Sequence, residues 1–231
     1  MRVLFVLLFS LISYQSSALS IDKMVLVGDK AGNGVFTLNN NNSYTSYITG
    51  TITEIDVQGE EVIEKKYDES NFEDWEITLT HPKLILESAR TKQVGVRSLC
   101  GLKCNFERDH VYQINFVPVP YADESGEVPI VAVNIGYAPL YIIPAEKQDI
   151  DYYIRNEGDE IYVENRGNTF FRVGINQCEE EIKDSCRTAY TVLAGRIKRF
   201  SLPEAAQSNV LNVIIVNHDD TYVRRFKLSK E

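Results

Sequence analysis

Short stretches rich in β-branched and aromatic residues recur along this chain about every 8 to 12 residues, with turn-forming residues between them. No long stretch shows the periodicity of an amphipathic helix, which is about 3.6 residues. Such spacing is typical of β-sandwiches. The chain has 231 residues, more than the roughly 100 to 150 of a typical single domain. The sequence therefore predicts an all-β protein made of two sandwich domains.

The strand pattern pauses at Pro144 and restarts at Tyr152. We therefore expect a first domain over residues 19–144 and a second over residues 145–231. Because the linker between them is short, the domains should sit at a fixed angle with a cleft between them. The expected strands cover residues 21–27, 35–38, 44–57, 77–80, 84–86, 94–99, 111–117 and 128–143 in the first domain, and 160–164, 169–175, 188–193, 196–202, 210–216 and 222–228 in the second.

The N-terminus has the layout of a secretory signal peptide over residues 1–18. Arg2 precedes an apolar run over residues 3–12, and small residues end the segment at Ala18. The apolar run is shorter than the roughly 20 residues that span a bilayer, although a short N-terminal anchor is the alternative. The sequence predicts an exported, soluble mature protein without membrane insertion.

The charge balance excludes some partners. The chain has 24 basic and 33 acidic residues, and removal of Arg2 with the leader would give a net charge of −10. A strongly acidic protein is a poor match for nucleic acid or for an anionic membrane surface.

Four cysteines in an exported chain suggest disulfides, and local pairing is the simplest connectivity. Cys178 and Cys186 flank an acidic loop, whose closure would contribute about 2–3 kcal/mol. Cys100 and Cys104 can pair only if their Cα atoms approach within about 7 Å. Zinc is the alternative, but the second spacing is wide and no histidine is near, so we expect no metal.

Residues 128–144 form an uncharged run of β-branched, aromatic and small residues. Read as a strand, it presents Val131, Val133 and Ile135 on one face, and small or polar residues on the other. The bulky row needs a partner, which is either the core of its own domain or another chain that pairs with an exposed edge.

Nothing in the sequence names a catalytic group. His81, His110 and His218 are scattered, and there is no nucleophile elbow or phosphate-binding loop. We therefore expect neither catalysis nor a cofactor. An enzyme stays an open alternative, because catalytic groups meet in space rather than in sequence.

Four segments together resemble the periplasmic, PapD-like chaperones of the chaperone/usher pathway, which assemble bacterial fimbriae. The second domain, with Cys178 and Cys186, is most similar to the alternate class that serves colonisation-factor type fimbriae. The segments are a proline-led strand with its partner (80–86 and 96–99), an acidic and alternating stretch that ends in prolines (107–120), the run at 128–144 with its Tyr-x-x-Leu ending, and residues 160–168.

The resemblance implies two immunoglobulin-like sandwiches and a function by donor-strand complementation. In that mechanism the chaperone lends its seventh strand to an incomplete fimbrial subunit. Val131, Val133 and Ile135 would then be the side chains inserted into the subunit, a burial of about 5–8 kcal/mol before the costs of association. A register slip of one residue would instead turn them into this domain's own core.

In the family, two basic residues bind the C-terminal carboxylate of the subunit. Lys23 matches the first, unless its stem merely reaches past the apolar face to solvent. The run at 128–144 contains no basic residue, so Arg97 or Lys147 would have to replace the second. Asp109 matches an acidic residue of an interdomain charge network, but its expected basic partner is Ile142 or Ile143 here.

The resemblance also implies location and partners: the periplasm of a Gram-negative cell, fimbrial subunits and an outer-membrane usher. The protein would be monomeric with a subunit bound, and could cap itself as an oligomer when free. The rival interpretation is a two-domain fimbrial subunit or a carbohydrate-binding adhesive protein.

Overall fold

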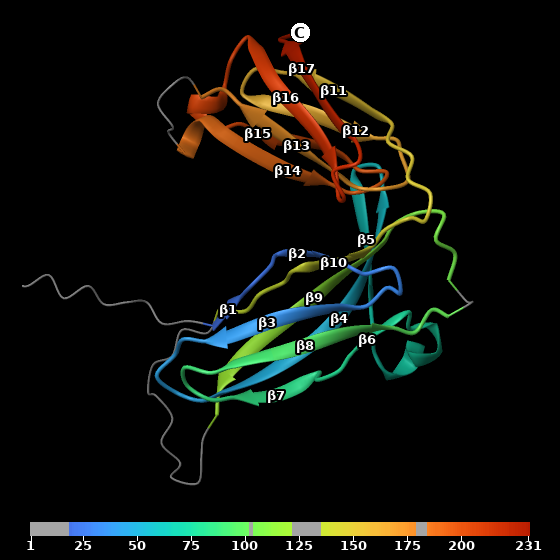
Figure 1. Cartoon of the computed structure of the whole chain (residues 1–231), viewed down its shortest axis with the longest axis vertical. Coiled ribbons are helices and arrows are strands. Elements are labelled where there is room, and N and C mark those ends of the chain that lie inside the picture. Colours follow the sequence, from blue (N-terminus) through green and yellow to red (C-terminus); the bar gives the residue numbers. More distant parts are fainter. Residues whose placement is uncertain (1–18, 102–103, 122–134, 179–183) are drawn as a thin grey trace, which may run out of the picture.

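A computed structural model describes residues 19–101, 104–121, 135–178 and 184–231 (Figure 1). The predicted signal peptide and residues 128–134 of the expected donor strand, including Val131 and Val133, lie outside these ranges. Within them the protein is almost entirely β, with only three short 3-10 helices: η1 (Glu69–Asp74), η2 (Asp184–Cys186) and η3 (Glu204–Ala206). The predicted all-β class is confirmed.

The first sandwich packs two sheets face to face. Alternate side chains of each strand point inward, and Phe36, Tyr112, Phe116 and Tyr141 are completely buried between the sheets. The rings of Phe36 and Phe116 meet edge to face at 5.7 Å. One sheet has the order β1 (Leu19–Ile21), β3 (Gly34–Asn40), β8 (Thr91–Ser98), β6 (Ile77–Leu79); the other has the order β2 (Val25–Val27), β10 (Leu140–Ile143), β9 (His110–Pro120), β4 (Ser46–Gln58), β5 (Glu61–Lys66), and β7 (Lys83–Leu86) also pairs with β4.

The second sandwich is smaller. Its core is built from inward-facing residues such as Ile161, Val163, Phe171 and Val173, none of which is exposed. Six of its strands lie close to the predicted ranges, because each alternates apolar and polar residues. A seventh strand, Tyr152–Asn156, was not among those expected. One sheet has the order β11 (Tyr152–Asn156), β12 (Glu160–Asn165), β15 (Ile197–Ser201). The other has the order β14 (Arg187–Val192), β13 (Phe171–Asn176), β16 (Val210–Asn217), β17 (Val223–Ser229).

The expected strand over residues 21–27 is wrong. The chain leaves β1 at Asp22, crosses to the other sheet, and continues as β2 from Val25. Asp22 holds the crossing point, since its carboxylate accepts from the amide of Thr37 at 2.9 Å. Lys23 therefore lies in the crossing and not within a strand.

Of the expected strand over residues 128–143, the structure describes residues 135–143, and only part of these form a regular strand. Regular pairing is confined to β10, and one isolated bridge joins Tyr137 to Phe116. Pro139 has no N–H to donate to a ladder, although its carbonyl still accepts from Ile114. Residues 137–139 therefore follow β9 as extended chain before β10 begins.

Both predicted cysteine pairs are disulfides. Cys100 and Cys104 have their Cα atoms 5.1 Å apart, and so do Cys178 and Cys186. The zinc alternative is excluded at these sulfurs, because zinc needs free thiolates. Among the described residues, no helix has the length and apolar character needed to cross a membrane.

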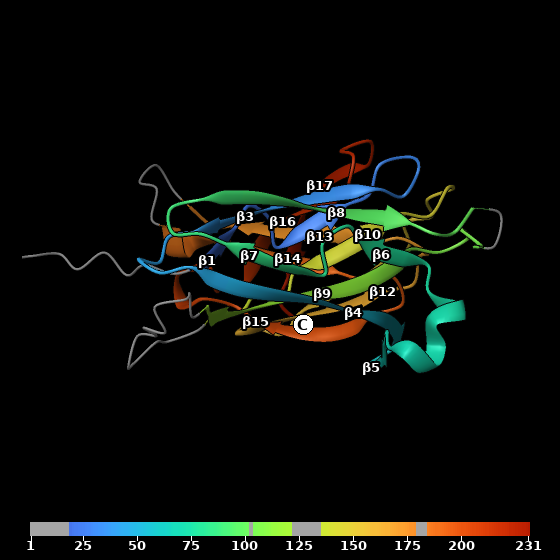
Figure 2. The same ribbon diagram turned by 90° about the horizontal axis from the view of Figure 1, so that it is seen from below.

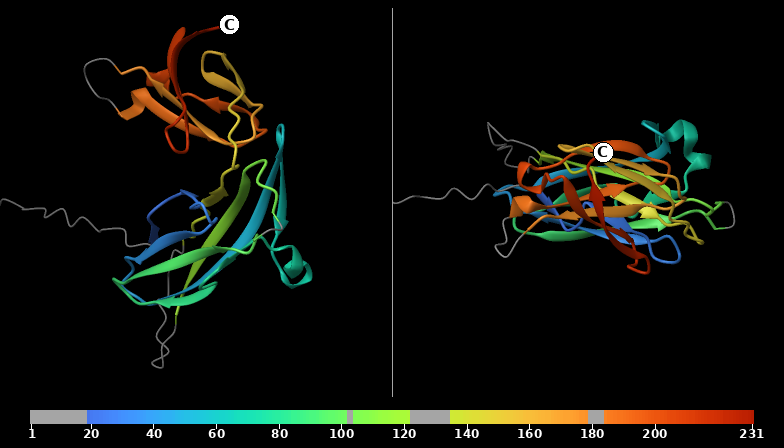
Figure 3. Two further views of the ribbon diagram at one scale, coloured as in Figure 1. Left: turned by 45° about the vertical axis from the view of Figure 1, so that its right-hand side comes forward. Right: turned by 90° about the horizontal axis from the view of Figure 1, so that it is seen from above.

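A small apolar cluster joins the two sandwiches. Phe170 and Leu193 of the second sandwich pack on one face of the β2-β10-β9-β4-β5 sheet, against Val57, Val111 and Ile142. We call this the domain-facing face of that sheet. Figure 1 and the left view of Figure 3 show the second sandwich beyond this face, with the β4–β5 hairpin reaching toward it.

Hydrogen bonds reinforce the junction. The guanidinium of Arg108 donates to the carbonyls of Val57 and Ala194, one from each sandwich. Gly59 in the β4–β5 turn forms a parallel bridge with Arg196, which precedes β15. Viewed along the long axis in Figure 2, the two sandwiches overlap. These contacts at the β4–β5 hairpin therefore join the two sandwiches beside the apolar cluster.

Candidate functional site

The first sandwich has an open edge beside residues 135–138. Tyr137 exchanges both of its backbone hydrogen bonds with Phe116 of β9, at 2.7 and 3.0 Å. In an antiparallel pair the backbone groups of the flanking residues then point the other way. Those residues are Gly136 and Ala138, and no hydrogen bond between described residues involves either of them. A free strand edge of this kind can accept a further strand.

The open edge ends where β2 begins. The amide of Leu140 donates to the carbonyl of Met24 at 2.9 Å, and β10 then pairs in parallel with β2. From Leu140 onward β10 is hydrogen-bonded on both sides, to β2 and to β9. Along the described residues 135–143, backbone groups are therefore available to a partner before Leu140 and not after it.

Ile135 projects from the start of this edge with 54% of its surface exposed. Ile135 is two residues from Tyr137, which packs on the core, and six residues from the buried Tyr141, so all three are spaced by even numbers of residues. Side chains an even number of residues apart share one face of a strand. Ile135 therefore points to the core side of the sheet, but at a position where the sandwich offers it little to pack against.

Lys23 lies where the open edge ends and β2 begins. It immediately precedes Met24, whose carbonyl bonds to Leu140, and its side chain is exposed. None of the ion pairs between described residues includes Lys23. A single positive charge is thus placed beside the point where the edge stops, although not on the continuous strand that the sequence predicted.

The other two candidate cations are elsewhere. Arg97 is exposed on β8, where its neighbour Val96 faces the core, so it belongs to the outer surface of the opposite sheet. Lys147 is exposed in the linker, and its carbonyl accepts from the side chain of Asn168 at 2.8 Å. The structure therefore does not bring Arg97 to the edge that Lys23 ends.

Asp109 lies at the junction of the sandwiches, as its match to an interdomain residue suggested. Its carboxylate accepts from the amide of Ala145 in the linker at 2.9 Å and from that of Phe170 in the second sandwich at 2.7 Å. Burial raises the pKa of Asp109, and these amide donors act against that rise. Backbone amides thus stand where the family places a basic side chain.

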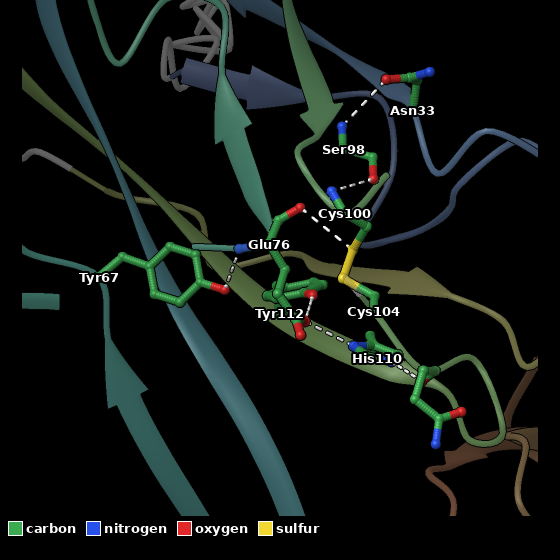
Figure 4. Close-up of a disulfide and its surroundings, with 9 residues drawn as sticks. Asn33, Tyr67, Glu76, Ser98, Cys100, Cys104, His110 and Tyr112 are labelled. Atoms are coloured by element: carbon green, nitrogen blue, oxygen red, sulfur yellow. Dashed lines mark hydrogen bonds and ion pairs between the residues drawn. A yellow bond between two sulfur atoms is a disulfide. The ribbon is translucent and has the colours of Figure 1, made fainter. Parts of the chain in front are cut away.

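A partly buried polar cluster that no sequence pattern indicates lies beside the Cys100–Cys104 disulfide (Figure 4). Glu76 accepts from His110 Nδ1 at 2.7 Å and from the hydroxyl of Tyr112. The other ring nitrogen of His110 lies 2.6 Å from the carbonyl of Asn105. Because both ring nitrogens face acceptors, the imidazolium form is the one that satisfies both.

The pKa values in this cluster shift together. The hydrogen bond to Glu76 raises the pKa of His110, despite the opposing effect of burial. Burial alone would raise the pKa of Glu76, but the hydrogen bonds from His110 and Tyr112 outweigh it, and the pKa is lowered. Burial also raises the pKa of Tyr112. Both shifts favour the charged pair, which ties the start of β9 to the residue before β6.

Replacing His110 by glutamine is expected to flatten the pH dependence of stability. Since the folded-state pKa is raised, the stabilisation by His110 is complete below its unfolded pKa of about 6.5 and is lost as the pH rises through the folded value. In the wild type we expect a loss on the order of 1 kcal/mol as the pH rises from about 6 through the raised folded-state pKa. Chemical unfolding across this range measures it.

The matched control is His81→Gln, because His81 is exposed and bonds only with its neighbour Thr80. This variant should keep the wild-type pH profile. An equally steep profile in His110→Gln would show that the cluster does not carry the effect.

Comparison with known proteins agrees with this architecture. Residues 21–144 match the family model described as CS5 fimbrial protein N-terminal domain. A search of curated protein sequences gives no match.

Among solved structures, the class 5 fimbriae chaperone CfaA aligns with a TM-score of 0.54 and 19% identity, covering 92% of this chain and 99% of that one. A chain of the Salmonella enterica SafA pilin–SafB chaperone complex aligns with a TM-score of 0.59 and 10% identity, covering 93% and 97%. At identities this low, the alignments show a shared two-domain fold. The resemblance to fimbrial chaperones is confirmed, and since the matched model spans more than half of the sequence, the chain belongs to the family of the CS5 fimbrial protein N-terminal domain.

Proposed function

We propose that this protein is a periplasmic chaperone that binds fimbrial subunits by donor-strand complementation and passes them to an outer-membrane usher. The observation that carries the proposal is the open edge at Gly136 and Ala138, flanked by the exposed Ile135. An incomplete sandwich that lacks one strand offers the matching edge. Solved structures of the same fold include chaperone–pilin and chaperone–tip adhesin complexes.

The geometry suggests how a subunit is held. A subunit strand laid along the edge would satisfy the free N–H and C=O groups of Gly136 and Ala138. Ile135 would enter the subunit's core, because a side chain on the inner face of one sandwich stays on the inner face when a second sandwich continues the sheet. Val131 and Val133 are proposed to follow it, on the strength of the sequence pattern alone.

Lys23 is proposed to bind the terminal carboxylate of the subunit. A strand that follows the open edge toward Leu140 must stop where β2 occupies that side, and Lys23 stands at that point. An ammonium group without an ion pair among the described residues suits a carboxylate there. Lys147 in the linker remains the proposed second cation, and Arg97 does not, because it faces outward from the opposite sheet.

Lys23→Ala is expected to weaken subunit binding about tenfold to a hundredfold, the effect of losing one charge-assisted hydrogen bond. The fold should not change, since the side chain is exposed. Titration of a purified subunit peptide with a free C-terminus measures the loss. An amidated peptide should bind both proteins equally, and a Lys23→Ala protein that still prefers the free carboxylate would refute the assignment.

Co-expression with the cognate subunit tests the function itself. We expect a soluble complex of one chaperone and one subunit, and a chaperone that melts cooperatively when purified alone. The rival interpretation, a fimbrial subunit or adhesive protein, predicts that the isolated chain is unstable until a donor peptide is added. Failure to solubilise any subunit, together with stabilisation by a donor peptide, would replace the chaperone proposal by that rival.

The proposed mechanism needs no catalytic group and no cofactor. It uses backbone hydrogen bonds, apolar burial and one or two cations. Export through a cleaved signal peptide over residues 1–18 and residence in the periplasm complete the proposal, because the subunits are met only after export.

A further inference from the structure

An apolar patch lies exposed on the domain-facing face of the first sandwich, far from the second sandwich. On β9, Tyr112, Ile114 and Phe116 point to the core, so Val117 and Val119 point to the domain-facing face. They are 48% and 42% exposed, whereas Val111 on the same face is only 5% exposed because the second sandwich covers it. The same apolar face is thus covered at one end and bare at the other.

Neighbouring strands widen this surface. Tyr47 of β4 stands opposite Val119 on one side and opposite Ile85 of β7 on the other. Tyr121 follows two residues after Val119 and is 42% exposed. We call these residues the outer patch: Tyr47, Ile85, Val117, Val119 and Tyr121.

The outer patch is continuous with the open edge. Since Tyr137 pairs with Phe116, Gly136 lies beside Val117. A Cβ atom at Gly136 would stand 3.7 Å from the Cγ2 atom of Val117. The missing side chain leaves the flank of Val117 uncovered on the side from which a partner strand would approach.

We infer that a bound fimbrial subunit makes a second apolar contact here, through a large apolar side chain that crosses Gly136 and packs on Val117. A strand paired with the open edge lies about 4.8 Å beyond Gly136. An aromatic or long aliphatic side chain opposite a glycine commonly lies across it. The guest side chain would point away from the subunit's core, on the face opposite to that of Ile135.

This inference rests on the proposed function but adds a recognition element to it. Backbone pairing is available to any strand, and insertion of Ile135 requires only an open groove. A requirement for a large apolar residue on the outward face of one subunit strand would select among subunits. The partner is thus specified by chemistry: a strand with an aromatic or long aliphatic residue opposite Gly136.

Val117→Ser tests the contact by removing apolar surface without introducing charge. We expect the complex with the co-expressed subunit to dissociate about fivefold to tenfold faster. The melting temperature of the free chaperone should not change, because Val117 is exposed. The matched control is Val35→Ser, since Val35 is 44% exposed on β3 in the opposite sheet.

A photo-crosslinking residue supplies independent evidence. With benzoyl-phenylalanine at position 119, we expect a crosslink to the subunit strand that pairs with the open edge, at an outward-facing residue identified by mass spectrometry. The same residue at position 35 should give only background.

The outcomes separate this inference from the proposed function. One outcome refutes only the second contact. In it the wild-type complex forms and a charge at Ile135 destroys it, but Val117→Ser dissociates at the same rate as Val35→Ser and position 119 does not crosslink. If Val117→Ser alters self-association of the free protein and leaves the subunit complex intact, the outer patch belongs to a second copy of this chain, and the inference is again overturned. If the wild-type protein forms no complex with any subunit, the proposed function itself fails.

Discussion

Ile135→Asp is expected to weaken subunit capture by at least about a hundredfold while leaving the free chaperone folded. In the free protein 54% of the Ile135 surface is exposed, so a carboxylate there stays hydrated. In the complex the same carboxylate would enter an apolar groove, and burial of an unpaired charge costs several kcal/mol. Co-purification of a tagged subunit, with the amount of soluble complex quantified, measures the loss.

The control for Ile135→Asp is Val35→Asp, which places the same charge at another exposed aliphatic residue, on the opposite sheet. It should leave capture unchanged. The free Ile135→Asp protein should also keep its far-UV circular dichroism spectrum and melting temperature. Capture at the wild-type level by a folded Ile135→Asp protein would remove Ile135 from the donor surface.

Asp109→Ala is expected to lower the melting temperature by about 6–12 °C, through a loss of about 3 kcal/mol. The substitution leaves the amides of Ala145 and Phe170 buried without an acceptor. One amide belongs to the linker and the other to the second sandwich, so the loss falls on the contact between the domains. Differential scanning calorimetry measures the shift, and small-angle scattering should show a broader distribution of domain angles.

Asp149→Ala is the matched control, since Asp149 is an exposed linker carboxylate without a hydrogen bond to its side chain among the described residues. It should melt within about 1–2 °C of the wild type. Asparagine at position 109 should recover only part of the loss, because an amide side chain offers one acceptor oxygen to the two N–H groups. An Asp109→Ala protein that melts and scatters like the wild type would show that other contacts fix the domain angle.

Most strands of both sandwiches could be predicted because alternating apolar and polar residues report directly on which face is buried. β5 and β11 were not among the expected strands, and all six residues of β5 are exposed, so burial leaves no alternation there. The crossing at Asp22–Met24 could not be predicted, because Ile21 and Val25 continue the same alternation although they belong to different sheets. A local pattern records that a residue is buried, but not which of two sheets buries it.

The sequence left open whether residues 128–143 pair on both sides or form an edge, and the limits of the open edge at residues 135–138 could not be predicted. They depend on where β2 pairs with β10, and that is a contact between residues more than a hundred positions apart. The partners of Asp109 were hidden for another reason. They are backbone amides, which every residue except proline carries and no sequence motif marks. The pairing of Glu76 with His110 likewise joins two residues that are distant in the sequence and carry no local signal.

β5 forms part of the opposite margin of the sheet that bears the open edge, beside β7, and every residue of β5 is exposed. Four of its six residues are charged: Glu61, Glu64, Lys65 and Lys66. Charges along such a margin discourage a foreign strand from docking. The two margins of the sheet therefore differ in charge: β5 carries four charged side chains, whereas residues 135–138 beside the open edge carry none. A foreign strand is discouraged from docking on β5 but meets no such charge at the open edge.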